Sequence, residues 1–166
     1  MTFPLSQIAE NTVPFDFVFL EQSTCKMFGL QYKALYRNGQ DHWPLSQLQH
    51  ERLRAFHDWG YYCLSEVTSP MDYKIAIHRA RFVPVSLNFE PRLYANRLDM
   101  RYYRWGGFIA GLEGCTVGRR VATRQDVEQA LRPADRDYIE EVDRYLVDVF
   151  LANLQERRLL HLDDRL

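Results

Sequence analysis

Apolar residues that recur at helical spacing near the end of the chain constrain the fold most strongly. Seven of them form one stripe: Tyr138, Val142, Tyr145, Leu146, Val149, Phe150 and Leu154. Pro133 suits the first turn of such a helix, and acidic residues crowd the same end, where the helix dipole favours negative charge. The pattern predicts a C-terminal helix that packs on its own sheet or, alternatively, forms the seam of a homodimer.

The first third of the chain combines strand patterns with one helix. An apolar run at 15–20 and alternating side chains at 30–36 predict strands, and Asn38-Gly39 predicts the tight turn of a hairpin. Ser46 opens a helix pattern in which Gln49 completes a capping box, and Gly60 ends it. The residues expected on its buried stripe are Leu48, Leu53, Phe56 and Trp59.

The central region predicts further strands. Ile75 and Ile77 share one face of a short strand, and a longer alternating run covers 83–89. Since Pro84 has no N–H to donate, this second strand is expected at a sheet edge or at a bulge. Five of the eight glycines fall between Gly106 and Gly118, which predicts a loop or tight turn there.

Together these patterns predict one α+β domain that spans residues 1–166. Thr123 with Asp126 predicts a capped helix near the end of the central region. In the expected architecture, a mainly antiparallel sheet packs against the helix at 46–59 and the C-terminal helices. A content of 46% apolar and 14% aromatic residues is ample for the core of a single globular domain.

Charge is distributed unevenly along the chain. Residues 74–124 hold ten Lys or Arg, nine of them arginine, against three acids, whereas the whole chain has a net charge of −1. Arginine grips carboxylate or phosphate in two-point geometry, so this segment predicts an anionic ligand, although pairing with acids elsewhere in the fold is equally compatible. The candidate partners are an anionic small molecule, a nucleic acid or an acidic protein surface.

The densest part of this segment mixes arginines with aromatic rings. As a strand it places Arg101, Tyr103 and Trp105 on one face; as a helix it aligns Arg97, Arg101 and Arg104 beside Trp105. Stacking plus charge suits a nucleobase with its phosphate or a planar aromatic acid. We therefore predict ligand-binding roles for these five residues and for a separate basic doublet, Arg119-Arg120. The alternative is that Tyr102 and Trp105 are core residues while the arginines pair with acids of the C-terminal helices.

A catalytic alternative rests on Asp58, Asp72 and Lys74. Two carboxylates can hold Mg²⁺ while a lysine activates water against a phosphodiester. This D…D-x-K spacing over three residues resembles the nuclease motif of the restriction-endonuclease-like fold, which implies a metal-dependent phosphodiesterase. The alternative for Asp72 is a polar residue of a turn at 69–72. Outside this hypothesis no cofactor and no metal site are expected.

The remaining reactive residues carry weaker signals. His50 and His57 lie seven residues apart on the expected helix, too far for one metal ion, and Cys115 is expected to be buried. Three widely spaced cysteines and the absence of an 18-residue apolar segment favour a cytoplasmic protein without a membrane span. Three functions stay open: an anion-binding or regulatory module, the nuclease, and a structural subunit that docks through its C-terminal helix.

Overall fold

The computed structural model describes residues 2–4, 14–21, 23–67, 73–85, 92–94 and 101–132, and these residues form an α+β fold, as predicted. The main sheet has the order β1-β2-β3-β6-β7, and β9 also pairs with β3. Its strands are β1 (Thr2–Pro4), β2 (Phe17–Glu21), β3 (Lys26–Lys33), β6 (Gly60–Leu64), β7 (Arg81–Pro84) and β9 (Arg119–Arg120). A second sheet contains β4 (Tyr36–Asn38), β5 (Gln40–Pro44) and β8 (Arg92–Tyr94).

Both sheets are mainly antiparallel, as expected. Among the described strands, the single parallel pair joins β3 to β6, with Gly29 opposite Gly60. The helix α2 (Gln47–Arg54) lies between these two strands in the sequence and makes the crossover. Strand β7 is the last in the order of the main sheet and carries Pro84, in agreement with the edge position that the proline predicted.

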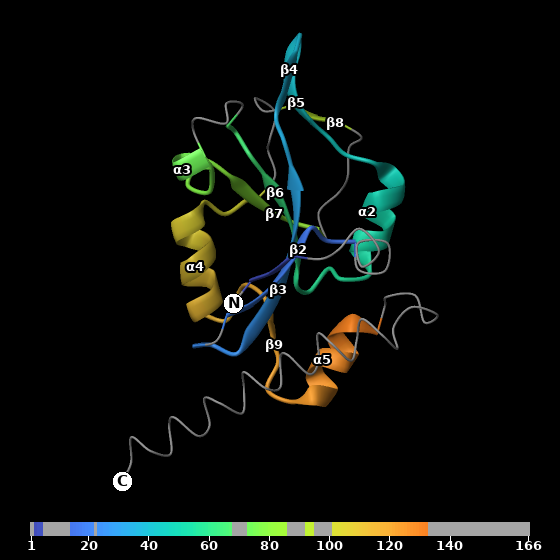
Figure 1. Cartoon of the computed structure of the whole chain (residues 1–166), viewed down its shortest axis with the longest axis vertical. Helices are drawn as coiled ribbons and strands as arrows, with labels where there is room; N and C mark the ends of the chain where they lie inside the picture. The colour runs from blue at the N-terminus through green and yellow to red at the C-terminus, as the bar shows by residue number, and fades with distance from the viewer. Residues whose placement is uncertain are drawn as a thin grey trace.

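Helices cover both faces of the main sheet. Figure 1 shows α4 (Trp105–Glu113) and the short α3 (Tyr73–Ala76) on one side of the strands, with α2 and α5 (Arg124–Leu131) on the other. Tyr62 and Leu64 of β6 join the core under α2 and α5, whereas Tyr61 and Cys63 join the core under α4. Because the strand is buried on both faces, its sequence lacks the polar alternation of a half-exposed strand.

Helix α2 begins where the sequence predicted. The Ser46 hydroxyl accepts a hydrogen bond from the backbone N–H of Gln49, but the helix ends at Arg54 and turns lead on to Gly60. The predicted capping box is not reciprocal, since the Gln49 side chain binds the Lys33 ammonium instead. The buried stripe was wrong at Leu48, which is 63% exposed; the helix buries His50 and Leu53.

The glycine-rich segment is a helix, which corrects the predicted loop. In α4, Phe108 and Leu112 are buried four residues apart under the main sheet, and this burial outweighs the low helix propensity of glycine. Gly106 and Gly107 lie on the exposed side of α4. Gly111 is required for packing, because a Cβ there would lie 2.6 Å from a methyl group of Val117.

The short strand predicted at Ile75 and Ile77 is also wrong. Residues 73–76 form α3, and the backbone N–H of Arg79 donates to the carbonyl of Ile75 across one helical turn. Both isoleucines are exposed, so burial does not impose a two-residue alternation on this segment. Of the strand predicted at 83–89, the structure describes residues 83–85, and residues 86–89 lie outside the described part.

Helix α5 begins at the predicted capping signal. The Thr123 hydroxyl accepts from the N–H of Asp126, and the Asp126 carboxylate accepts from the N–H of Thr123, so the capping box is complete. The buried side of α5, formed by Val127, Ala130 and Leu131, packs on the same face as α2. The C-terminal helix predicted from Pro133 lies outside the described residues.

Strand β3 organises the main sheet because it pairs with three other strands. It runs antiparallel to β2 on one side; on the other, it pairs with β6 and, at Lys26 and Met27, with β9. The buried Lys26 ammonium donates to the carbonyl of Val117 over 2.9 Å, across a sequence separation of 91 residues. The start of β3 therefore fixes the turn that follows α4.

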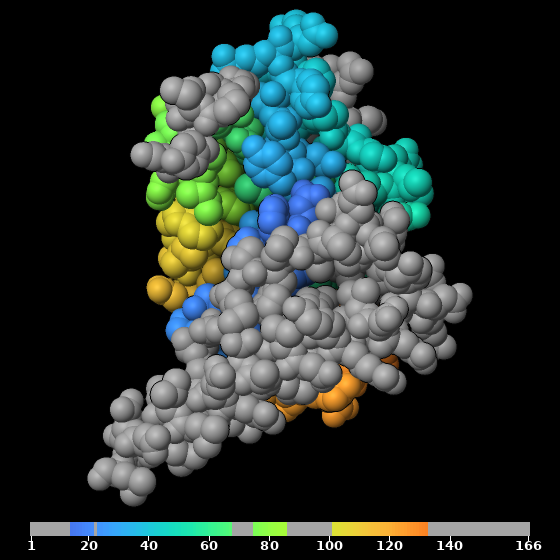
Figure 2. Space-filling view, viewed as in Figure 1, coloured from blue at the N-terminus to red at the C-terminus, as the bar shows by residue number. Residues whose placement is uncertain are grey.

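The predicted hairpin forms and extends from one end of the molecule. Strands β4 and β5 pair antiparallel around Gly39, whose φ of +87° is the left-handed conformation that the Asn-Gly turn requires. Figure 2 shows this hairpin, in light blue, standing out beyond the body of the described surface. The strand predicted at 30–36 is interrupted at residues 34–35, where the chain passes from β3 of the main sheet to β4 of the second sheet.

Candidate functional site

Glu66 and Arg81 meet where β6 and β7 lie side by side. The two strands are antiparallel with Leu64 opposite Arg81, so the chain just beyond β6 passes close to the start of β7. There the Nε of Arg81 donates to Oε1 of Glu66 in an ion pair between two largely buried side chains. This pair is the centre of the candidate site.

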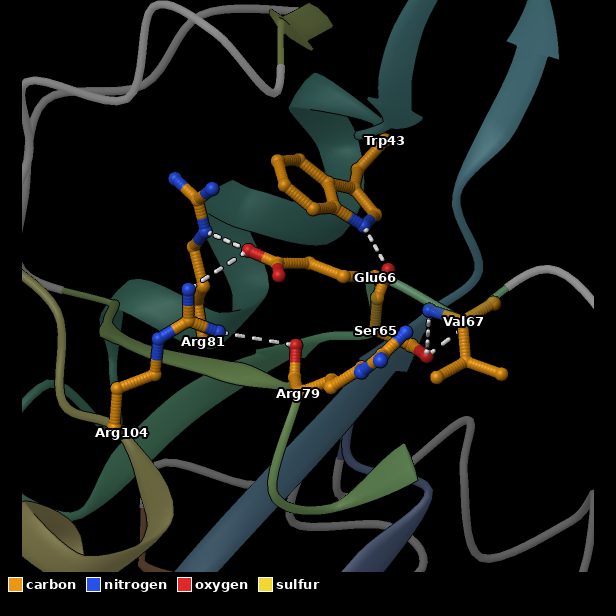
Figure 3. A network of polar contacts seen from close by, with 7 residues as sticks. All are labelled: Trp43, Ser65, Glu66, Val67, Arg79, Arg81 and Arg104. Carbon is orange, nitrogen blue, oxygen red and sulfur yellow. Dashed lines mark hydrogen bonds and ion pairs between the residues drawn. The ribbon is translucent and has the colours of Figure 1, made fainter. Parts of the chain in front are cut away.

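A second arginine reaches the same carboxylate from α4. Just before α4, Tyr103 forms an isolated antiparallel bridge to Phe82 of β7, with two backbone hydrogen bonds between them. This pairing places Arg104, the N-cap residue of α4, beside the end of β6. Its Nη2 lies 3.2 Å from Oε1 of Glu66, and its Nη1 donates to the backbone carbonyl of Arg79 over 3.2 Å. Figure 3 shows both guanidinium groups converging on this one carboxylate.

Two aromatic rings complete the site. The guanidinium carbon of Arg81 lies 5.0 Å from the ring centre of Tyr102 and 5.7 Å from that of Trp43, and that of Arg104 lies 5.4 Å from Tyr102. The Trp43 indole N–H donates to the carbonyl of Ser65 over 2.7 Å, which fixes the ring beside Glu66 (Figure 3). We name Trp43, Glu66, Arg81, Tyr102 and Arg104 the arginine cluster.

The arginine cluster has an excess of positive charge. Two guanidinium groups share one carboxylate, and the two terminal nitrogens of Arg81 point away from Glu66 in Figure 3. Arg104 is more open, with 45% of its side chain exposed. Burial by itself raises the pKa of Glu66, but hydrogen bonds from Arg81 and Arg104, together with their charges, lower it below its usual value. Glu66 is therefore held ionised.

The lowered pKa predicts how acid affects the stability contribution of Glu66. The ionised carboxylate of Glu66 stabilises the folded state fully above the unfolded-state pKa of about 4.3. This stabilisation is lost as the pH falls through the lower folded-state pKa. We expect Glu66→Gln to reduce the free energy of unfolding at neutral pH and to reduce it less at about pH 3. Urea denaturation of both proteins at the two pH values measures this; an equal or larger difference in acid would contradict the assignment.

The structure brings only part of the predicted arginine–aromatic set together. Arg104 belongs to the arginine cluster, and Arg101 lies exposed three residues before it. Tyr103 and Trp105 instead pack against the core under α4, where both rings contact Phe108. Tyr103 forms a bridge to a strand, whereas α4 begins at Trp105, so neither of the two predicted periodicities holds throughout. Arg97 lies outside the described residues.

One arginine of the basic doublet forms an ion pair with an aspartate that the nuclease alternative uses. Arg119 donates to the Asp58 carboxylate over 3.0 Å, while Arg120 is exposed on β9. Asp72 lies outside the described residues, and Lys74 belongs to α3. Within the described part of the chain, no group of three or more His, Cys, Asp or Glu side chains is placed to hold a metal ion. Asp58 therefore has a cationic partner from its own chain.

The other reactive side chains lie away from the arginine cluster. His50 is buried and stacks on Tyr62, with its Nδ1 3.0 Å from the tyrosine hydroxyl, whereas His57 is exposed. The Cys63 thiol is buried, and burial raises its pKa to about 12. Cys115 is exposed, contrary to the expected burial, because it occupies a turn after α4 with a φ of +61°.

Sequence reasoning missed Glu66, Arg81 and Trp43. Glu66 and Arg81 are 15 residues apart and meet only because β6 and β7 pair in one particular register. Trp43 comes from the second sheet, and no periodicity links it to the other two. The feature of the sequence that indicated the site was the high density of arginine in residues 74–124. It indicated Arg104 but not the residues that Arg104 contacts.

Comparisons with protein-family models, with curated proteins and with solved structures find no match for this chain. Among the described helices, none combines the length and the apolar character needed to cross a membrane. The function must therefore be inferred from the site itself.

Proposed function

We propose that the protein is a binding module that recognises anionic groups on an acidic protein partner through the arginine cluster and the neighbouring Arg101. The observation that carries the proposal is the position of Glu66, whose carboxylate is held by two guanidinium groups of the same chain. A geometry that holds an internal carboxylate provides the donors for an external one. Arg104 and Arg101 supply the exposed positive charge.

An acidic protein surface suits this site better than a nucleobase. Tyr102 is 38% exposed, but its ring already contacts the guanidinium groups of Arg81 and Arg104, so it is not a free stacking platform. Tyr103 and Trp105 are engaged in the core under α4. What the surface offers a partner is charge-assisted hydrogen bonding, which both carboxylate and phosphate groups satisfy.

The test is a titration of the full chain with a fluorescent oligoglutamate peptide and with a single-stranded oligonucleotide at low and moderate salt. We expect the peptide to bind in a salt-sensitive manner and Arg104→Ala to weaken it by about tenfold. Arg132→Ala removes the same charge from the end of α5 and serves as the matched control, with affinity expected to stay unchanged. Equal losses in the two variants, or binding by the oligonucleotide alone, would overturn the proposal.

A substitution of Glu66 should change the affinity for the peptide in the opposite direction in the same assay. Because its carboxylate competes for the guanidinium groups, Glu66→Gln is expected to raise the affinity for the peptide, by up to about fivefold for a pair worth about 1 kcal/mol. A lower affinity would mean that Glu66 positions the arginines and does not occupy their binding sites.

A cytoplasmic location belongs to the same proposal and is supported by three free thiols, Cys25, Cys63 and Cys115.

A further inference from the structure

A polar cavity of about 240 Å³ lies between α2 and the adjoining ends of β2 and β3, apart from the arginine cluster. Its polar lining consists of Asp16, Gln31, Ser46, Gln49 and Arg52, and none of the residues of the arginine cluster contributes to it. The volume is below the range of about 300 to 1,000 Å³ that is typical of sites for drug-sized ligands. The cavity therefore suits a small polar molecule.

One wall of the cavity carries a fixed carboxylate. Oδ2 of Asp16 accepts hydrogen bonds from the Gln31 side chain over 2.7 Å and from the backbone N–H of Tyr32 over 2.6 Å. Gln31 is only 5% exposed, so this arrangement is anchored in the sheet. Both hydrogen bonds go to the same oxygen, and within the described part of the chain Oδ1 has no donor. Asp16 can therefore accept from a cationic group in the cavity.

The wall formed by α2 supplies donors. The ammonium of Lys33 donates to Oε1 of Gln49 over 2.7 Å, which leaves the Gln49 amide nitrogen as the donor of that side chain. The Ser46 hydroxyl oxygen accepts from the backbone and keeps its O–H as a donor. Arg52 forms no ion pair or side-chain hydrogen bond with any other described residue. This wall therefore offers two neutral donors and one cation.

The two walls are complementary to a molecule that carries both charges. We propose that the cavity binds a small free amino acid, with its ammonium group at Asp16 and its carboxylate at Ser46, Gln49 and Arg52. A simple anion would leave Oδ1 of Asp16 without a donor, and a simple amine would leave the Arg52 guanidinium without an anionic partner, so each would use only half of the polar lining. Pro14 and Leu48, which also line the cavity, provide apolar surface for a short aliphatic side chain.

Isothermal titration calorimetry of the full chain with L-alanine and L-valine tests the proposal. The matched analogues are propionate, which lacks the ammonium group of alanine, and ethylamine, which lacks its carboxylate. We expect binding of at least one of the two amino acids at millimolar concentration, and affinities at least about tenfold weaker for both analogues. No binding of either amino acid, or propionate binding as well as alanine, would overturn the proposal.

Variants then locate the binding site. Arg52→Gln is expected to weaken amino-acid binding by at least about tenfold. Arg54→Gln removes the same charge from an exposed position on the same helix, outside the cavity, and should leave the affinity unchanged. Asp16→Asn retains an oxygen for Gln31 and Tyr32 but loses the charge, so it should also weaken binding. Equal losses in the Arg52 and Arg54 variants would refute the site, independently of the peptide assay on the arginine cluster.

Discussion

Gly60→Ala is expected to lower the free energy of unfolding by about 1 to 3 kcal/mol, although the substitution adds a single methyl group. Gly60 opens β6 and pairs with Gly29 of β3, and together they leave a gap in the face of the sheet under α2. The ring of Phe15 fills this gap: a Cβ on Gly29 would lie 2.7 Å from the ring, and one on Gly60 would lie 2.8 Å from it.

The surroundings prevent the ring from moving aside. Phe15 is fully buried, with its ring centre 5.5 Å from that of Phe56 and 4.9 Å from that of Trp59. At Gly60 the added carbon would also lie 2.9 Å from the backbone carbonyl oxygen of Phe56, which cannot move without the turn that leads into β6. The three atoms nearest to a Cβ on Gly29 all belong to the Phe15 ring, so Phe15→Leu should recover part of the loss caused by Gly29→Ala but less of the loss caused by Gly60→Ala.

Gly106→Ala is the matched control for these glycines. It makes the same chemical change in α4, where no atom other than those of the adjacent residues and of the helix's own backbone lies within 4 Å of the added carbon. Since alanine has the higher helix propensity, we expect this variant to be stabilised by up to about 1 kcal/mol. Urea denaturation monitored by circular dichroism measures the four single variants and the two double variants that combine Phe15→Leu with Gly29→Ala or Gly60→Ala. A loss in Gly106→Ala equal to that in Gly60→Ala would show that space around the glycine does not determine the effect.

Trp43→Phe is expected to be more destabilising than Trp59→Phe, by about 1 to 3 kcal/mol. Both indoles are fully buried in the same core, so the two substitutions remove the same atoms from similar surroundings. They differ in hydrogen bonding. The Trp43 N–H donates to the carbonyl of Ser65 over 2.7 Å, whereas the buried Trp59 N–H has no hydrogen-bond partner among the residues that the structure describes. Trp43→Phe loses that bond and leaves the Ser65 carbonyl without its donor.

The difference between the two tryptophan variants reports mainly on the hydrogen bonding of the two indole N–H groups. The loss of packing is common to both, and removal of the unpaired Trp59 N–H relieves a desolvation cost. The free energies of unfolding of the two variants, measured under the same conditions, give the difference directly. Equal stabilities would show that the bond to Ser65 contributes nothing. Since Trp43 also contacts Arg81, the peptide assay on Trp43→Phe reports whether the ring positions the arginine cluster.

Local signals in the sequence predicted those elements whose cause is local. The Asn38-Gly39 turn, the Ser46 N-cap and the Thr123 capping box each depend on a few neighbouring residues, and each lies where it was expected. Helix α4 was missed because its glycines were interpreted without the sheet, and burial of Phe108 and Leu112 decides its structure. Short segments such as 75–77 are ambiguous until their burial is known.

The candidate site was predictable only in its charge. Arg104 was expected to bind an anion, but its partner Glu66 and its neighbour Arg81 come together through the register of β6 and β7. The prediction also assigned Tyr103 and Trp105 to a ligand, whereas their rings pack against Phe108. Sequence spacing gives the side on which a residue lies within one element; it does not reveal which element covers that side.

The threefold pairing of β3 has a consequence for the nascent chain during synthesis. Its partner β2 is made first and β6 soon after, but β9 and the carbonyl that receives the Lys26 ammonium follow only after α4. Until then the start of β3 has an open edge and a lysine without its acceptor. Contacts between such distant residues slow folding, because a long loop must close before they form. We therefore expect a ribosome-bound chain that stops before β9 to be far more sensitive to protease than one that includes α5.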